Sequence, residues 1–148
     1  MQPRLSLAVQ YASDAATLPA RQQLRRWVST AMQRDIRMTL RIVDEVEGRE
    51  LNLAYRGRDY ATNVLTFVYD EAGMLSGDVA ICAPVVERES IEQHKDLMAH
   101  YAHMTIHAVL HLQGFDHETD RDAKRMEALE TRLMVRLRYP DPYMEPEA

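Results

Sequence analysis

A segment in the last third of the chain combines three histidines with one glycine, and it constrains the fold more than any other part of the sequence. His107 and His111 are four residues apart within a largely apolar run over 97–113, and Gly114 and His117 follow. Residues four apart on a helix lie on the same face, so the run predicts a long helix with both imidazoles on one side. Gly114 tolerates the positive φ that ends a helix and reverses the chain. We therefore expect His117 to face the other two rings.

Three neutral imidazoles with a fourth position left to water are typical of a catalytic zinc site. Structural zinc sites usually have four protein ligands, often cysteines, and Cys82 is the only cysteine of the chain. We predict one zinc ion held by His107, His111 and His117, which would lower the pKa of its bound water and polarise a substrate oxygen. Other divalent ions also suit this set of ligands.

The side chains around the three histidines carry weaker signals. Asp116 and Glu118 flank the last histidine, where each could accept a proton, support a ligand or cap the turn. His100 and His103 continue the helical stripe without a following glycine, so we expect structural or at most supporting roles. His94 lies in a polar turn and is expected to be solvated.

Apolar periodicity along the chain predicts an α+β fold. The expected strands cover residues 5–10, 36–43, 62–69 and 78–82, and the expected helices cover 19–33, 50–56, 84–92, 97–113 and 119–138. No repeat or linker rich in Pro, Gly or Ser divides the 148 residues. We expect a single domain over residues 1–148, with a four-stranded mixed sheet, about five helices, and the metal site at the end of a long central helix.

Charge is distributed unevenly along the chain. The net charge is −5, but residues 1–62 hold ten arginines and seven acids, a balance of +3, whereas residues 63–148 hold eight basic and sixteen acidic residues, a balance of −8. The guanidinium group suits bidentate contact with phosphate, although each arginine could also simply be solvated. The basic half could therefore contact a phosphodiester backbone, although a net charge of −5 disfavours strong nonspecific binding of a polyanion.

The sequence also carries expectations about cellular location. Charged residues or histidines interrupt every apolar run before the roughly 18 residues that a membrane span needs. The first residues lack the apolar segment of a secretion signal, and a lone cysteine fits a reducing compartment. We expect a cytoplasmic protein without a membrane partner.

Three ordered blocks match a known family. The first is the run from His107 to His117, including Asp116. The second is Leu-Asn-Leu-Ala-Tyr-Arg-Gly-Arg-Asp-Tyr-Ala-Thr-Asn-Val-Leu-Thr-Phe over residues 51–67, and the third is Gly-Asp-Val-Ala-Ile over 77–81; residues 126–130 and 139–143 are similar too. With these blocks the chain resembles the YbeY family of bacterial endoribonucleases, also called rRNA maturation factors, over roughly residues 5–143. Departures are confined to Thr66, Val68 and Ala108, where the family often has Ser, Pro and Gly.

The resemblance implies a zinc-dependent, single-strand-specific endoribonuclease in which His107, His111 and His117 hold the ion. It implies a functionally essential arginine at Arg56, and we expect Arg56 and His107 to be the catalytic residues. It also implies ribosomal RNA as the substrate, notably the 3′ end of small-subunit rRNA, and a role in ribosome quality control. Small-subunit proteins and an assembly GTPase are the implied partners, and no DNA partner is expected.

Two alternatives remain at this point. The spacing of histidines and glycine is also that of metzincin peptidases, but those enzymes have glutamate directly after the first histidine, where this chain has Ala108. The second alternative is a noncatalytic ribosome-assembly factor in which the ion only fastens the turn at Gly114. Without the resemblance, Arg56 would simply be expected to pair with Asp59 on the surface.

Overall fold

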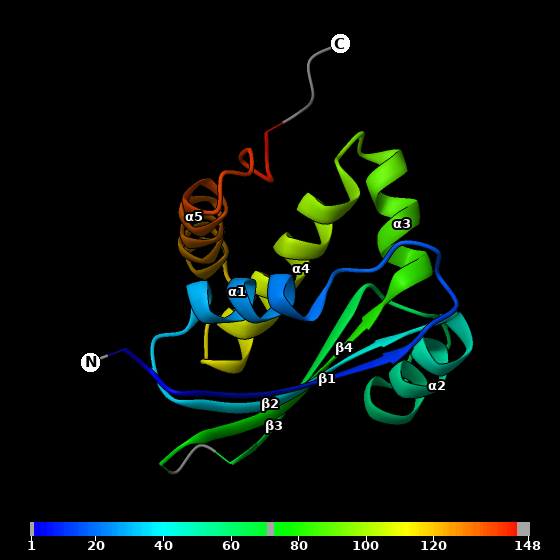
Figure 1. Cartoon of the computed structure of the whole chain (residues 1–148), viewed down its shortest axis with the longest axis horizontal. Helices are drawn as coiled ribbons and strands as arrows, with labels where there is room; N and C mark the ends of the chain where they lie inside the picture. Colours follow the sequence, from blue (N-terminus) through cyan, green and yellow to red (C-terminus); the bar gives the residue numbers. More distant parts are fainter. Residues whose placement is uncertain (1, 71–72, 145–148) are drawn as a thin grey trace.

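A computed structural model describes residues 2–70 and 73–144, which form one sheet flanked by helices (Figure 1). The strands are β1 (Leu5–Ala12), β2 (Ile36–Val43), β3 (Val64–Asp70) and β4 (Leu75–Cys82). The helices are α1 (Arg21–Ala31), α2 (Glu45–Arg56), α3 (Ala83–Glu92), α4 (Leu97–Leu112) and α5 (Asp120–Arg136). For the described residues the predicted α+β fold with four strands and five helices is confirmed. None of the described helices is long and apolar enough to cross a membrane.

The sheet has the order β1-β2-β4-β3, with three parallel strands and an antiparallel edge strand, β3. Leu40 at the middle of β2 lies in register between Val9 and Val79. Alternate β2 side chains point into the core, as their period of two predicts, whereas Arg37 and its outward neighbours face the other way. The sheet therefore has one face packed against α4, whereas the opposite face is more polar and is covered in part by α2.

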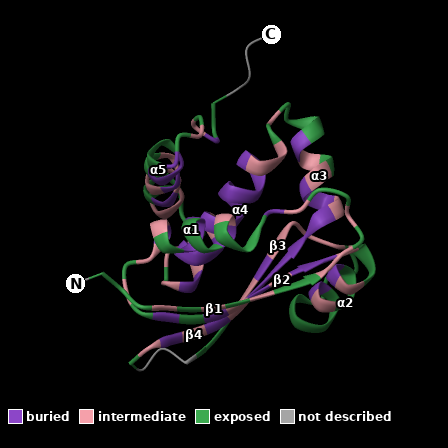
Figure 2. Ribbon diagram, in the orientation of Figure 1, coloured by how far each residue is buried: buried purple, intermediate pink, exposed green. Residues whose placement is uncertain are grey.

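Helix α4 lies across the inner face of the sheet, with α1 and α5 beside it (Figure 1). Twelve of its sixteen residues are buried, among them Tyr101, Ile106 and Leu110 (Figure 2). The carboxylate of Asp96 caps its first turn by accepting the Ala99 N–H at 3.1 Å. A buried central helix of this kind holds the side chains of its last turns in fixed positions.

Two element boundaries differ from prediction by three residues or more, and the others lie within two residues. Helix α2 begins at Glu45, five residues before the predicted start at residue 50. The prediction missed this first turn because it is charged and contains Gly48, so it shows no apolar periodicity. Gly48 lets α2 lie close to the end of β4, because a Cβ at this position would lie only 3.1 Å from the Cys82 sulfur. Strand β4 begins at Leu75 rather than residue 78, because Leu75 pairs with Ile36 on β2. Both boundaries are set by contacts distant in the sequence.

Candidate metal centre and its arginine

The three histidines of the predicted site converge in space. His107 and His111 lie on consecutive turns at the end of α4 with their rings nearly parallel, 6.4 Å apart between centroids. Gly114 has φ +100°, as predicted, and reverses the chain. His117 thereby returns to within 5.6 Å of the His107 ring and 6.3 Å of the His111 ring. The arrangement expected from the helical spacing and the glycine is present.

The ring spacing is slightly wider than that of a closed metal site. Zn–N bonds of about 2.1 Å at tetrahedral angles would place ring centroids about 5 Å apart. Among the described residues, no group of three or more His, Cys, Asp or Glu side chains is already closed around a metal position. The difference of about 1 Å is within the reach of side-chain rotation. The three rings could therefore hold an ion with small movements of the side chains and no change of backbone.

The chemistry of the rings also fits a metal. The Nδ1 atom of His111 is buried and has no hydrogen-bond partner. Burial, followed by the neighbouring rings of His107 and His117 and by Arg56, lowers the pKa of His111. The ring is therefore neutral near pH 7, which is the form that binds a metal ion.

A buried carboxylate, Glu130 of α5, lies behind the first of these histidines. It is 1% exposed, and its Oε1 atom lies 2.5 Å from His103 Nε2, 2.8 Å from the Tyr143 hydroxyl that donates to it, and 3.4 Å from His107 Nδ1. Burial by itself would raise the pKa of Glu130, but hydrogen bonds with His103 and His107 lower it to about 2. With Nδ1 facing this carboxylate, the other ring nitrogen of His107 is left for the pocket.

Sequence reasoning did not single out Glu130. The available signal was an acidic residue within the apolar stripe formed by Met126, Leu129 and Leu133 on the predicted last helix. A carboxylate at such a position needs a buried partner. The partner lies on another helix, so the sequence alone did not identify it.

The remaining histidines take the expected structural positions. His100 is 3% exposed, and its Nε2 lies 2.9 Å from Glu89. His103 is also buried and reaches the metal centre only through Glu130. His94 is exposed in a turn with φ +54°, as its polar surroundings predicted.

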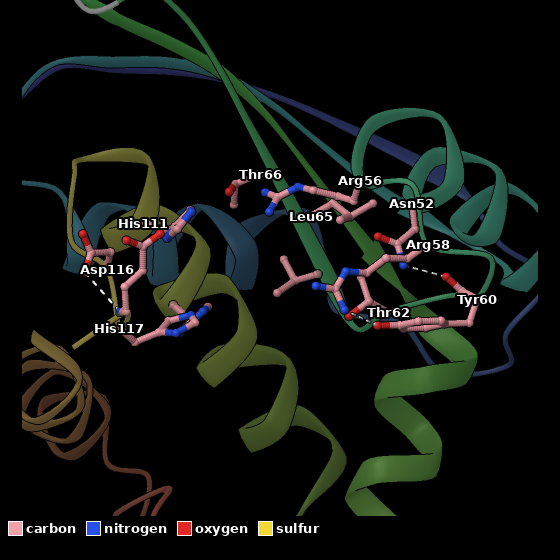
Figure 3. A pocket seen from close by; sticks show the side chains of 13 residues that line it. Asn52, Arg56, Arg58, Tyr60, Thr62, Leu65, Thr66, His111, Asp116 and His117 are labelled. Atoms are coloured by element: carbon pink, nitrogen blue, oxygen red, sulfur yellow. Dashed lines mark hydrogen bonds between the residues drawn. The ribbon is translucent and has the colours of Figure 1, made fainter. Parts of the chain in front are cut away.

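Arg56 points into the same cavity from the side opposite the histidines. It is the last residue of α2, and Gly57 follows with φ +68°, which ends the helix beside β3. Figure 3 shows its guanidinium across the cavity from His111 and His117. The cavity has a volume of about 360 Å³ and is also lined by Asn52, Arg58, Tyr60, Thr62, Val64, Leu65, Thr66, His107, Asp116 and Glu118. Arg56 and His107, which are 51 positions apart in the sequence, thus line one cavity.

The surface pairing considered for Arg56 is not formed. Asp59 pairs instead with Arg49, with nitrogen–oxygen distances of 2.6 and 2.9 Å. The buried amide of Asn52 donates to the Tyr60 carbonyl at 2.7 Å and so fixes the loop after Gly57. The guanidinium of Arg56 is left to face the cavity.

The residues expected to assist chemistry have mixed positions. Asp116 lines the cavity, and its Oδ1 also accepts the Glu118 N–H at 3.3 Å, so it caps the local turn as well. Ala108, where a metzincin peptidase has glutamate, is fully buried in the core and lies outside the cavity lining. The carboxylate that peptidase chemistry requires at this position is therefore lacking.

Comparison with known proteins decides the family. A family model described as Endoribonuclease YbeY matches residues 9–138. A protein of that name from Methylobacillus flagellatus is 54% identical over 141 residues, covering 95% of both chains. Another from Thiobacillus denitrificans is 57% identical over 145 residues, covering 97% of this chain and 99% of the relative. The chain belongs to the Endoribonuclease YbeY family.

The match to the Endoribonuclease YbeY family spans every element that builds the cavity. It includes Arg56 and all three histidines of the candidate metal centre. The solution structure of a protein from Thermotoga maritima has the same fold, with a TM-score of 0.57 over 93% of this chain and 99% of the other at 24% identity. The resemblance inferred from three sequence blocks is confirmed.

Proposed function

We propose that this chain is a zinc-dependent endoribonuclease that cleaves single-stranded RNA in the cavity between Arg56 and the three histidines. The observation that carries the proposal is the placement of an arginine opposite three convergent imidazoles in one open cavity. Membership of the Endoribonuclease YbeY family supports RNA as the substrate. His107, His111 and His117 would hold the ion.

When bound, the zinc ion would supply a Lewis acid and a water of lowered pKa. The protein supplies the other functions. The guanidinium of Arg56 binds two nonbridging oxygens of the scissile phosphate, where negative charge accumulates in the transition state. A fixed donor of this kind contributes about 3 kcal/mol to lowering the barrier. The Asp116 carboxylate, which lines the same cavity, is placed to accept a proton.

We further propose ribosomal RNA as the physiological substrate, notably the 3′ end of small-subunit rRNA, with a role in ribosome quality control. A net charge of −5 supports reliance on partners, because an acidic protein gains little from nonspecific attraction to RNA. Small-subunit proteins and an assembly GTPase in the cytoplasm are the partners that we propose.

The test is cleavage of a precursor of small-subunit rRNA by wild-type protein and by Arg56→Ala, Arg56→Lys and His107→Ala variants. We expect Arg56→Ala to cleave about 100-fold more slowly, and Arg56→Lys to recover only part of the loss because lysine lacks the planar fork. Arg26→Ala, an exposed arginine on α1, is the matched control and should cleave as wild type does.

Equal cleavage by all four variants would assign the activity to a contaminating nuclease and reject the proposal. Normal ribosome maturation with Arg56→Ala, combined with unfolding on chelation, would favour a noncatalytic assembly factor instead. Sequencing of the product ends identifies the attacking group: a 3′-hydroxyl end indicates water, and a 2′,3′-cyclic phosphate indicates the ribose 2′-hydroxyl.

A further inference from the structure

A second hollow lies on the outer face of the sheet, between α2 and the strands β2, β4 and β3. Its volume is about 300 Å³, and three aromatic residues, Tyr55, Phe67 and Tyr69, line it. The strand register places Phe67, Asp78 and Thr39 side by side on this face across three strands. The hollow is separate from the cavity of the histidines, which lies on the inner side of β3.

The aromatic rings are exposed and held in place. Tyr55 is 66% exposed and Tyr69 is 69% exposed. Tyr55 packs against Phe67 with ring centroids 4.9 Å apart, and the Tyr69 hydroxyl donates to Asp78 at 2.8 Å. Large rings that are fixed yet exposed to water are typical of a surface that binds a flat apolar ligand.

The charges of this face favour bases over phosphates as the ligand. Arg41 is already bound by Glu47 through two hydrogen bonds of 2.6 and 2.9 Å, and Asp78 adds another negative charge. Arg37 lies two residues before Thr39 on β2, is exposed on the same face, and has no ion pair among the described residues. One guanidinium is thus available for a phosphate, next to rings that suit nucleobases.

The hollow adjoins the candidate active site, because neighbouring residues of the chain line the two cavities. At the end of α2, Arg56 lines the histidine cavity and Tyr55 lines the hollow. On β3, Thr66 lines the histidine cavity and Phe67 lines the hollow. The end of α2 and the edge strand β3 are therefore shared by both sites. A nucleic acid strand bound at Arg56 has an adjoining aromatic surface within reach.

We infer that this aromatic hollow binds unpaired bases of the RNA on one side of the cleaved phosphate. The inference rests on the proposed function, to which it adds a subsite for the flanking single strand. Stacking on Tyr55 and Tyr69 tolerates any base, because every base has a π face. Bases inside a duplex have both faces stacked on their neighbours, so the hollow selects single-stranded substrate next to the cut.

The test compares Tyr55→Leu and Tyr69→Leu, which keep an apolar side chain but remove the ring. Tyr11→Leu is the matched control: Tyr11 is 37% exposed, donates one hydrogen bond to the Pro19 carbonyl, and lies on the opposite face of the sheet. Stopped-flow anisotropy measures binding of a labelled single-stranded RNA before it is cleaved. Two further RNAs carry abasic nucleotides on one or the other side of the cleavage position. Thermal melting checks that each variant is folded.

We expect Tyr55→Leu and Tyr69→Leu each to weaken binding about tenfold, and Tyr11→Leu to bind as wild type does. Abasic positions on one side should weaken wild-type binding by a similar factor and weaken the two variants no further. Equal binding by all variants would overturn the inference, as would an undiminished abasic effect in the two variants. Unchanged RNA binding with loss of associated small-subunit proteins would assign the rings to a protein partner and overturn it too.

These outcomes are distinguishable from failure of the proposed function. Ring-dependent binding without cleavage by any form would reject the nuclease proposal and leave the hollow as an RNA site. Cleavage by wild-type protein that is indifferent to Tyr55 and Tyr69 would keep the nuclease proposal and reject the hollow.

Discussion

Replacement of Glu130 by glutamine tests whether the buried carboxylate positions the proposed metal ligand His107. The change keeps the shape of the side chain and an oxygen acceptor but removes the negative charge. Two good hydrogen bonds converge on that oxygen, at 2.5 Å from His103 and 2.8 Å from Tyr143. A hydrogen bond to a charged acceptor contributes about 1 kcal/mol more than a neutral one, so the expected loss of stability is about 2 kcal/mol.

The same change should weaken metal binding. Loss of the charged partner on Nδ1 of a ligating histidine typically costs about 10-fold to 100-fold in metal affinity. We expect Glu130→Gln to bind zinc at least about tenfold more weakly in a chelator-competition titration. Its thermal midpoint without metal should fall by about 4–8 °C. Glu127→Gln, one turn earlier on α5 and half-buried, is the control and should change neither value.

Unchanged zinc affinity in Glu130→Gln, together with the expected loss of stability, would refute a positioning role and leave Glu130 as a structural residue. Unchanged stability would show that the convergent hydrogen bonds contribute less than their geometry indicates.

Two other predictions concern stability. Gly77→Ala should lower the free energy of unfolding, measured by urea titration, by about 3 kcal/mol. The added Cβ would lie 2.6 Å from the Phe67 carbonyl oxygen, and the backbone cannot move aside. A loss under about 0.5 kcal/mol would contradict this prediction. Burial by itself would raise the pKa of Glu89, but hydrogen bonds from His100 and Asn63 lower it below its ordinary value of 4.5. The stability that Glu89 contributes is thus present above pH 4.5 and is lost as the pH falls through the lowered pKa, so Glu89→Gln should show a shallower acid loss of stability below pH 4.5. Urea unfolding between pH 3 and pH 6 measures how the free energy of unfolding depends on pH. An equal dependence in wild-type protein and Glu89→Gln would contradict the prediction.

The sequence was most informative where local periodicity coincided with burial. The alternation of β2 and the apolar run of α4 predicted both elements because each lies in the core. The positions of His107 and His111 relative to His117 followed from helical spacing and from the conformational freedom of Gly114. These inferences needed only local geometry.

Local sequence patterns did not predict which strands pair with each other. The strand order, with antiparallel β3 at the edge, depends on pairing between distant segments. That order brings the end of α2 to the cavity and so places Arg56 opposite His111. The first turn of α2 contains Gly48, which lies close to Cys82, and no residue near Gly48 signals that approach. The family resemblance, rather than periodicity, identified Arg56.

The most direct test of the metal-centre proposal is cleavage of single-stranded RNA by chelator-treated protein as zinc is added back. The proposal predicts that cleavage is lost on metal removal and is restored in full by one equivalent of zinc. His107→Ala protein should not regain activity at that stoichiometry. Full cleavage by metal-free protein, or restoration that does not require His107, would contradict the proposal.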